Sequence, residues 1–291
     1  ASVVVMPRFE AAAAIALIDK YQISIISLVP TVARLLLEHI EATAAACPSL
    51  RTMTATGEAF PVSLKERLAA ALPNVGLWVF YGMTEGGIPA ALRPEEQNLK
   101  PTSVGRPMPG VEIRLMGEAG GPVETGQSGE VQLRSGAPGQ AMIAREYFNR
   151  AEANAVAYKD GWFRTGDVGR FDEDGYLYLV DRVKDMILSG GLNVYSREVE
   201  QALETAPAVR EVAVVAGPDA EFGECVVAYV ALKQGQAATA SELIAHCRDY
   251  IAGYKKPKYL FLLDDLPRNV NGKVVKATLR ERTARDIAVA G

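Results

Sequence analysis

The stretch GLWVFYGMTEGG, residues 76–87, decides how this chain is organised. Its opening residues are apolar and typical of a buried strand, which then ends at Tyr81 and Gly82. Thr84 and Glu85 follow side by side, where an ordinary loop favours Asn, Asp or Pro. A hydroxyl and a carboxylate placed directly after a buried strand raise the question of what they bind.

Two strand–helix pairs precede this stretch. Residues 24–29 (SIISLV) predict a buried strand, and a helix starts at Pro30. Residues 50–56 (LRTMTAT) predict a second strand, and another helix starts after Pro61. The inner faces of these helices are expected to carry Leu35, Leu36 and Ile40, and then Leu64, Leu68 and Leu72. Strands that alternate with helices predict right-handed crossovers and a parallel sheet.

Ligands of such sheets lie beyond the carboxyl ends of the strands. The sequences TGEA, residues 56–59, and YGMTE, residues 81–85, both fall at that edge. Gly57 and Gly82 would let the backbone close on a flat ligand, and the ring of Tyr81 could stack on it. Each glycine taken alone predicts only a turn, whereas the two together at one sheet edge indicate a site.

The middle of the chain has a different pattern. Residues 111–116 (VEIRLM) and 130–134 (EVQLR) alternate apolar and polar side chains around a glycine-rich segment, which predicts antiparallel strands. Residues 167–182 predict a hairpin that turns at Asp174 and Gly175. The acidic cluster at this turn is too short for a calcium loop, so we interpret it as a turn.

The last third of the chain predicts a small α/β unit that begins after Arg182. Ser196 and Ser241 are expected to cap two helices. Three strands are expected in the sequences VREVAVVA, CVVAYVAL and KYLFLL, and a basic helix follows PRNVNGKVVK.

Composition excludes some functions. The net charge of -4 gives no electrostatic support to nucleic-acid binding. Residues 248–285 carry a local excess of Lys and Arg, which fits either a polyanionic small ligand or a solvated helical surface. The scattered Cys47, Cys225 and Cys247 lack metal-ligand spacing and predict a reduced, cytoplasmic protein. Residues 11–18 (AAAAIALI) are too few to span a bilayer, so we expect a core helix and no transmembrane segment.

Three motifs stand in the order YGMTEGG, GWFRTGDVGRFDEDGYLYLVDRVKDMILSGGLNVYSREVE and PRNVNGKVVKATLR. Together they closely resemble the adenylate-forming superfamily, and specifically its acyl-CoA synthetases. The resemblance runs through nearly the whole chain and implies an α/β fold class. Residues 1–182 would be the C-terminal part of a large AMP-binding domain, with a parallel βαβ part (1–100) and a β-rich part (101–182). Residues 183–291 would form a small, mobile α+β domain.

The resemblance also implies roles for individual residues. The residues implied to bind AMP are Gly57, Glu58, Ala59, Tyr81, Gly82, Met83, Thr84, Asp167 and Arg182. Tyr81 would stack on adenine, Thr84 would hydrogen-bond the α-phosphate, and Glu85 would sit near Mg²⁺. Asp167 would accept hydrogen bonds from both ribose hydroxyls, and Arg182 would donate one to the ribose. Phe80 has no polar group to offer adenine and is expected to pack.

The small domain would supply the remaining groups. The resemblance implies that Lys273 reaches the carboxylate oxygen and the phosphate during adenylation, which makes it catalytic together with Thr84 and Glu85. Lys184 falls at the hinge position on which the small domain pivots. The pivot would exchange Lys273 for the loop Ser189, Gly190 and Gly191, whose glycines let the backbone approach the thiol of coenzyme A.

One expected element is missing. The family needs a phosphate loop that ends in Pro-Lys-Gly to hold the ATP β- and γ-phosphates, and no stretch of this sequence matches it. The chain also enters a strand-like segment, residues 2–6 (SVVVM), almost at once. We therefore expect the N-terminal part of the large domain to be absent, and this chain alone to make little or no acyl-adenylate.

Three functions remain open from the sequence. The first is an acyl-CoA synthetase that uses ATP, Mg²⁺ and coenzyme A to activate a fatty or aryl carboxylic acid. The second is an adenylation domain that loads a carrier protein, and the third is a non-catalytic nucleotide-binding fragment. Gly86, Gly87 and Ile88 are expected to leave room for an acyl chain. The particular acid and the oligomeric state are not predicted.

Overall fold

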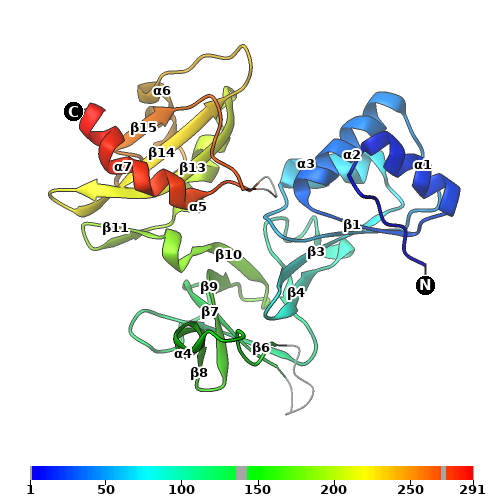
Figure 1. The fold of residues 1–291 in the computed structure, drawn as a ribbon, viewed down its shortest axis with the longest axis horizontal. Helices are drawn as coiled ribbons and strands as arrows, with labels where there is room; N and C mark the ends of the chain where they lie inside the picture. The colour runs from blue at the N-terminus through cyan, green and yellow to red at the C-terminus, as the bar shows by residue number, and fades with distance from the viewer. Residues whose placement is uncertain (1, 136–142, 270–272, 291) are drawn as a thin grey trace. The chain divides into compact units, whose positions relative to one another are not determined.

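The computed structural model describes residues 2–135, 143–269 and 273–290 of the chain (Figure 1). Two compact units divide these residues between them. The first unit comprises Ala1–Thr165 and Gly169–Leu179, and the second comprises Gly166–Val168 and Val180–Gly291. The domain boundary between residues 182 and 183 stays a prediction, because this division falls within two strands.

The first unit begins with a five-stranded sheet in the order β1-β2-β3-β4-β5. Its strands are β1 (Ile25–Leu28), β2 (Thr52–Ala55), β3 (Gly76–Met83), β4 (Gly87–Leu92) and β5 (Arg106–Pro107). Strands β1, β2 and β3 run parallel, as the alternation of strands and helices predicted. Strands β4 and β5 continue the sheet antiparallel, so the chain reverses immediately after β3 instead of crossing over.

Three helices accompany the parallel strands: α1 (Ala11–Tyr21), α2 (Pro30–Thr43) and α3 (Val62–Ala71). The core that they share with the sheet includes Ile18, Leu36, Leu37, Ile40, Met53, Leu64, Leu68, Leu72 and Val79. The prediction for α2 was wrong at Leu35, whose side chain is 47% exposed, because the helix turns Leu37 inward instead.

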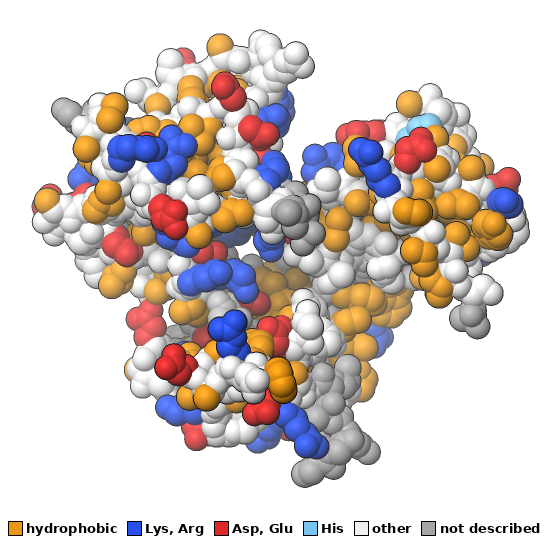
Figure 2. Space-filling model, in the orientation of Figure 1, with side chains coloured by type: hydrophobic (Ala, Val, Ile, Leu, Met, Phe, Trp, Pro, Cys, Tyr) orange, Lys and Arg blue, Asp and Glu red, His pale blue; other side chains and the backbone are white. Residues whose placement is uncertain are grey.

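The N-terminal segment and the edge strand β1 leave hydrophobic side chains exposed. Residues 2–6 form no strand, which corrects the expectation for SVVVM, and Val3 and Val5 are exposed. Strand β1 ends the sheet, and Ile25 on it is exposed as well. Hydrophobic side chains are scattered over the surface of this part of the first unit (Figure 2).

A second sheet has the order β10-β9-β7-β6. Its strands are β6 (Val111–Met116), β7 (Gly129–Ser135), β9 (Trp162–Phe171) and β10 (Leu177–Arg182), and the short β8 (Tyr158–Lys159) pairs with β9. Helix α4 (Ala151–Ala157) precedes β8. The antiparallel pairing of β6 with β7 is confirmed. The turn at Asp174 and Gly175 is also confirmed: Gly175 has φ +77°, and its amide donates to the carbonyl of Asp172 at 3.0 Å.

The second unit contains a five-stranded sheet in the order β12-β11-β14-β13, with β15 also paired to β14. Its strands are β11 (Ile187–Ser189), β12 (Leu192–Val194), β13 (Val209–Asp219), β14 (Gly223–Leu232) and β15 (Tyr259–Leu262). Its helices are α5 (Ser196–Glu204), α6 (Ala240–Cys247) and α7 (Lys276–Ala290). The three predicted strands and the C-terminal helix are confirmed, as is the α/β class of the chain.

Both predicted helix caps are wrong by one or two residues. The N-cap of α6 is Thr239, whose hydroxyl accepts from the amide of Glu242 while the Glu242 carboxylate accepts from the Thr239 amide. This reciprocal pair satisfies two backbone donors, which Ser241 inside the helix cannot do. Ser196 is the first residue of α5 and not its cap.

The thiols lie inside both units. Cys47 belongs to the core of the first unit, and Cys225 and Cys247 belong to cores of the second. Burial raises the pKa of all three thiols, and that of Cys247 to about 11. Among the described residues, no helix is long and apolar enough to cross a membrane.

Candidate functional site

The stretch YGMTEGG forms the tip of a tight hairpin between β3 and β4. Met83 pairs with Gly87 across it, and the amide of Gly86 donates to the carbonyl of Met83 at 3.3 Å. Gly87 has φ +61°, a conformation that favours glycine. Thr84 is exposed at this tip and Glu85 is half-buried. The hydroxyl and the carboxylate thus sit on a rigid turn rather than on a long loop.

The predicted loop after β2 lies beside this hairpin. A Cβ added at Gly82 would lie 3.1 Å from the carbonyl oxygen of Gly87 and 3.4 Å from the hydroxyl of Thr56. A side chain at position 82 would therefore require these neighbours to move apart by a few tenths of an ångström, so the absence of a side chain at Gly82 favours the close approach of the two strand ends. The residues that follow Thr56, namely Gly57, Glu58 and Ala59, are exposed at this edge, and Gly57 has φ +94°. The structure brings the TGEA and YGMTE sequences together.

Tyr81 differs from the expectation of an open platform. Its side chain is only 6% exposed and belongs to a buried cluster with Leu115, Leu133 and Phe163. A ligand can contact only the small part of the ring that remains accessible. Phe80 packs, as expected: its ring lies 6.1 Å from that of Trp78.

Leu133 and Met83 lie close to Gly86. A Cβ placed there would lie 3.0 Å from Cδ1 of Leu133 and 3.3 Å from Cγ of Met83, so those side chains already occupy the space. The room that the sequence predicts for an acyl chain at Gly86, Gly87 and Ile88 stays a prediction.

Glu85 has a tyrosine partner that the sequence did not predict. The hydroxyl of Tyr147 donates to Oε1 of Glu85 at 2.8 Å, and the amide of Ala144 donates to the Glu85 carbonyl at 2.6 Å. Asn154 fixes Tyr147 in turn, because its side chain bonds both the amide and the carbonyl of that residue. Burial, and then the hydrogen bond to Glu85, raise the pKa of Tyr147 to about 12, so its hydroxyl stays a donor at neutral pH.

A second tyrosine hydroxyl lies in the same surroundings. Burial and the charge of Glu85 raise the pKa of Tyr158, whose ring lies 6.0 Å from that of Tyr147. Within the part of the chain that the structure describes, the buried hydroxyl of Tyr158 has no hydrogen-bond partner. Two tyrosines therefore surround one carboxylate, and only one of them bonds it.

The donor set around Glu85 can be compared with what Mg²⁺ requires. The described residues contain no cluster of three or more acidic, His or Cys side chains that could enclose a metal ion. Mg²⁺ does not need one, since it is usually held by one or two carboxylates together with substrate phosphates and water. A single oriented carboxylate beside an exposed hydroxyl fits a magnesium ion that arrives with a nucleotide.

Asp167 and Arg182 face each other across β9 and β10 in the second unit. Nε of Arg182 donates to Oδ1 of Asp167 at 3.1 Å, and the Arg182 side chain remains 48% exposed. Gly166, with φ +72°, directly precedes Asp167. A carboxylate acceptor and a guanidinium donor side by side offer complementary hydrogen bonds to a pair of hydroxyls.

The predicted hinge and glycine loop are both close to the sheet of the second unit. Lys184 is exposed in the 3₁₀ turn η2 (Val183–Asp185). Gly190 and Gly191 form a two-residue turn between β11 and β12, with φ +57° and +80°. Positive φ at both positions is the requirement of a type I′ hairpin. The amide of Gly190 also donates to the carbonyl of Phe222 at 3.2 Å, so the loop is held at its tip.

Lys273 lies on an exposed segment just before α7. Its amide donates to Oδ1 of Asn269 at 3.0 Å, and its carbonyl accepts from the Asn269 amide at 2.9 Å. These two bonds tie the backbone of Lys273 to Asn269, and Lys273 is exposed to solvent.

The predicted residues thus form two groups. The first unit gathers Gly57, Glu58, Ala59, Tyr81, Gly82, Met83, Thr84 and Glu85, and the second unit carries Asp167, Arg182, Lys184, Ser189, Gly190, Gly191 and Lys273. Sequence reasoning missed Tyr147, which lies 62 positions from its partner Glu85, because no local spacing joins the two. The roles of the predicted residues remain predictions.

Comparisons with known proteins agree with this arrangement. Residues 1–148 match the AMP-binding enzyme family, and residues 198–273 match the AMP-binding enzyme C-terminal domain. The indoleacetate–CoA ligase of Aromatoleum aromaticum is 37% identical over 288 residues, which is 98% of this chain and 55% of the relative. The long-chain-fatty-acid–CoA ligase FadD13 of Mycobacterium tuberculosis is 35% identical over 95% of this chain and 54% of the relative.

A solved structure has the same fold. The o-succinylbenzoate CoA synthetase MenE of Bacillus subtilis, in complex with its acyl-adenylate intermediate, aligns with a TM-score of 0.83 and 33% identity. The alignment covers 94% of this chain and 54% of MenE. The same enzyme has also been solved with ATP and a magnesium ion. This chain therefore spans about half the length of the relatives that it matches, and it belongs to the AMP-binding enzyme family.

Proposed function

We propose that this chain carries the nucleoside-binding and thioester-forming residues of an AMP-forming acyl-CoA synthetase. The substrates would be a fatty or aryl carboxylic acid, ATP and coenzyme A. The observation that supports this most is the pair Asp167 and Arg182, an acceptor and a donor held 3.1 Å apart on adjacent strands. In the sequence, Asp167 and Arg182 lie between the hairpin of Thr84 and Glu85 and the segment of Lys273, which is the order of the family motifs.

The nucleoside is recognised by complementary polar groups. The carboxylate of Asp167 accepts from the ribose hydroxyls, and the half-exposed Arg182 donates to the ribose oxygen atoms. The exposed backbone of Gly57, Glu58 and Ala59 lines the adenine, while the accessible edge of Tyr81 limits its position. Because Tyr81 is buried, shape and backbone contacts contribute more to adenine binding than stacking does.

The first reaction forms a mixed anhydride. A carboxylate oxygen of the acid attacks the α-phosphorus of ATP, the bond from that phosphorus to the bridging oxygen breaks, and pyrophosphate leaves with the electron pair. The hydroxyl of Thr84 and the ammonium of Lys273 stabilise the charge that develops on the α-phosphate oxygens. Glu85, oriented by Tyr147, would hold Mg²⁺, which neutralises phosphate charge when it is bound.

The second reaction uses the thiol of coenzyme A. The thiolate sulfur attacks the acyl carbonyl carbon, the bond from that carbon to the phosphate oxygen breaks, and AMP leaves. A type I′ turn without side chains, at Gly190 and Gly191, lets a narrow pantetheine arm run along the backbone. Lys184 in the exposed η2 turn would be the pivot that exchanges Lys273 for this turn between the two reactions.

The acid class rests on the relatives. The ligases that this chain resembles act on indoleacetate and on long-chain fatty acids by their names, which supports an aryl or fatty acid here. Leu133 and Met83 fill the space beside Gly86, so a bulky ring cannot lie directly against that backbone.

The test uses a stable acyl-adenylate mimic, because the residues assigned to the nucleoside all lie in this chain. Indoleacetyl and palmitoyl sulfamoyl-adenosine would be titrated into the purified chain by calorimetry. We expect saturable binding of both, and at least tenfold weaker binding by Asp167→Ala, since a carboxylate that receives two hydroxyls contributes more than about 1.4 kcal/mol. Arg285→Ala, on the exposed side of α7, is the control and should bind like the wild type. Equal affinity of Asp167→Ala and wild type would overturn the assignment.

A further inference from the structure

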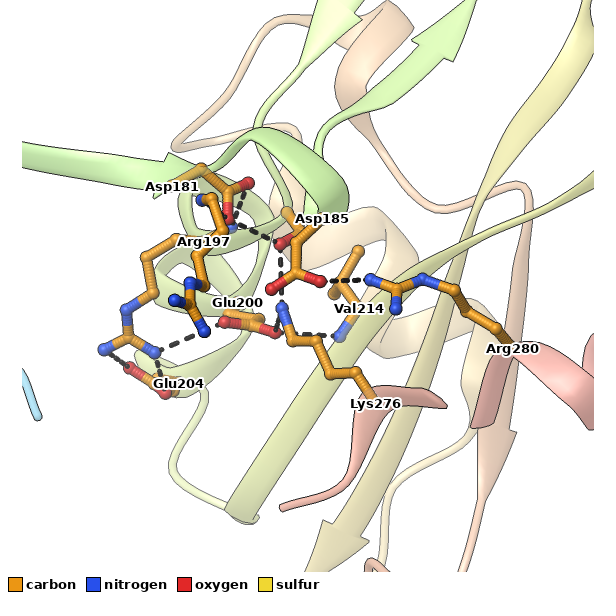
Figure 3. A network of polar contacts seen from close by, with 10 residues as sticks. Asp181, Asp185, Arg197, Glu200, Glu204, Val214, Lys276 and Arg280 are labelled. Carbon is orange, nitrogen blue, oxygen red and sulfur yellow. Dashed lines mark hydrogen bonds and ion pairs between the residues drawn. The ribbon is translucent and has the colours of Figure 1, made fainter. Parts of the chain in front are cut away.

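A network of polar side chains, of which Asp185, Ser196 and Glu200 are buried, lies in the second unit next to the predicted hinge (Figure 3). It begins at Asp181, whose carboxylate lies at the N-terminus of α5. Oδ1 accepts from the hydroxyl of Ser196 at 3.1 Å, and Oδ2 accepts from the amide of Arg197 at 3.4 Å. Tyr195, the N-cap residue, supplies no side-chain cap. Asp181 therefore caps a helix from outside it, where a negative charge is favourable.

Lys276 is the centre of the network. Its ammonium lies 2.7 Å from Oε1 of Glu200 and donates to the hydroxyl of Ser196 at 2.8 Å. Ser196 is fully buried. Its hydroxyl accepts a hydrogen bond from Lys276 and donates one to Asp181. Oε1 of Glu200 also accepts from the amide of Val214 on β13 at 2.9 Å. One ammonium thus connects the N-terminus of α5, the sheet and the first residue of α7.

Asp185, on the C-terminal side of the predicted hinge Lys184, is held by α7, the helix that also carries Lys276. Asp185 is buried and forms an ion pair with Arg280. Lys276 and Arg280 are four residues apart on α7, so they project from the same face of the helix. Both aspartates that flank Lys184 are therefore bound by residues of α5 and α7, while Arg182, Val183 and Lys184 between them are exposed.

Lys273 is close to this attachment in the sequence. It precedes Lys276 by three residues, at the entry to α7. The residues that follow it pair with the segment before it: the amide of Val275 donates to the carbonyl of Pro267 at 2.8 Å, and Val274 forms a bridge with Arg268. Two residues, Val274 and Val275, separate Lys273 from Lys276 along the chain, so the position of the first helical turn of α7 determines where Lys273 is presented.

We propose that Lys276 is a positioning residue, which locks the entry of α7 to the hinge through Ser196 and Asp181 and so fixes the backbone that presents Lys273. This inference rests on the proposed role of Lys273 in adenylation. It assigns a function to a residue that the reaction does not touch.

The energetics favour positioning over stability as the role of the network. A buried ion pair often stabilises a fold no more than apolar side chains of the same volume would, since both charges lose their hydration. What it does impose is a single arrangement, because any other leaves a buried charge without a partner. Among the described residues, the carboxylate of Glu200 is bonded by Lys276, Arg197 and the amide of Val214. Lys276 is thereby held in one place.

The test is residue-resolved amide hydrogen exchange by NMR on the 291-residue chain, with Lys276→Met, Lys276→Arg and Ser196→Ala. We expect Lys276→Met to speed exchange of the Lys273 and Val275 amides about tenfold, the effect of losing a hydrogen bond to a charged group. Ser196→Ala, which leaves the pair between Lys276 and Glu200 in place, should show the same pattern more weakly. Lys276→Arg, which keeps the charge, should return both amides to within about threefold of wild type. Arg285→Met, on an exposed part of α7, is the control.

Two outcomes would overturn the proposal. If exchange accelerates equally in β13 and β14, the network only stabilises the unit; if the Lys273 and Val275 amides do not respond, the network does not hold their turn. Where Lys276→Met does not fold, Ser196→Ala decides between these outcomes. No nucleotide is needed for this measurement, so a failure of the proposed nucleoside site would be recognised separately by the calorimetric titration, and a failure of the role of Lys273 in adenylation by ATP–pyrophosphate exchange of Lys273→Ala.

Discussion

The hairpin turn that carries Thr84 and Glu85 and the segment that carries Lys273 are held in different ways. The first is a reversal between two paired strands, and its carboxylate is held by the neutral hydroxyl of Tyr147. The second is bonded to Asn269 through the backbone of Lys273, and the helix after it is held by ion pairs to buried carboxylates. The hairpin owes its geometry to strand pairing, whereas in our proposal the position of Lys273 depends on ion pairs within the same unit.

This difference has a physical consequence. A turn fixed by backbone pairing keeps its shape when one side chain is lost, because the strands on either side still pair. A segment positioned by a network of ion pairs depends on every member, since removing one leaves the next without a partner. Side-chain changes near the first turn should therefore act locally, and changes in the network of the second should act across its unit.

The largest expected effect concerns Lys273 itself. In the complete enzyme, Lys273→Ala should slow adenylation by about 10²- to 10³-fold, because it removes one charge donor to the transition state. Thioester formation from supplied acyl-adenylate should stay close to wild type. The two half-reactions would be measured by ATP–pyrophosphate exchange and by acyl-CoA formation, with Arg285→Ala as the control. Equal losses in both half-reactions would place Lys273 outside the adenylation site.

The second prediction concerns the network. Glu200→Gln should destabilise the second unit by about 3 kcal/mol, because it breaks a buried ion pair while leaving the ammonium in place. Glu204→Gln, on the same helix but exposed, should cost at most about 1 kcal/mol.

Tryptophan separates the two units in this measurement. Trp78 and Trp162, the two tryptophans of the sequence, both belong to the first unit. Urea unfolding by tryptophan fluorescence should therefore be unchanged in Glu200→Gln, while the transition by circular dichroism should shift. A shift of the fluorescence transition by the same amount would show that the units unfold together, which would remove the distinction drawn between them.

The third prediction compares the two tyrosines around Glu85. Tyr147→Phe should destabilise the first unit by about 1 kcal/mol, since it removes a hydrogen bond to a carboxylate. Tyr158→Phe should be neutral or stabilising, because it removes a buried hydroxyl that has no hydrogen-bond partner among the described residues. Urea unfolding by tryptophan fluorescence would measure both variants, and a larger loss for Tyr158→Phe would contradict the hydrogen-bond assignment.

The smallest expected effect depends on pH. Asp219 precedes the turn of Phe222, whose carbonyl accepts from the amide of Gly190. The pKa of Asp219 is lowered to about 2, mainly by the hydrogen bond from Lys258 and then by those from the amides of Phe222 and Glu221. The folded chain favours the ionised carboxylate, so this stabilisation is complete above the ordinary pKa of 3.8 and is lost as the pH falls towards 2. Unfolding of Asp219→Asn followed between pH 6 and 2 should show a smaller loss of stability than wild type; parallel curves would contradict the assignment.

The sequence predicted the helices and strands well, but it predicted less well which side chains face the core and which residue caps a helix. Strands β1 to β3 and their helices follow from apolar periodicity, which is a local signal. Leu35, Leu36 and Leu37 are consecutive, however, and which of them faces the core depends on how α2 packs against its neighbours. The cap of α6 was readable, because Thr239 and Glu242 have the spacing of a capping box, and Ser241 was a competing hydroxyl nearby.

The candidate site shows the same limit. The strand ends that carry Gly57 and Gly82 were predicted to share one edge, and a parallel sheet requires it. The burial of Tyr81, the partner of Glu85 and the network around Lys276 were not predicted, since each joins residues that are far apart in the sequence. Their distances depend on tertiary packing, for which a single sequence carries no periodic signal.

The buried cysteines give each unit its own chemical probe of local opening. A thiol with a raised pKa inside a core reacts with an alkylating reagent only when the surrounding structure opens. The alkylation rate of Cys47 would then report how often the first unit opens, and the rates of Cys225 and Cys247 how often the second opens. Mass spectrometry of the alkylated peptides could follow both rates in one tube, without a label and without changing a single residue.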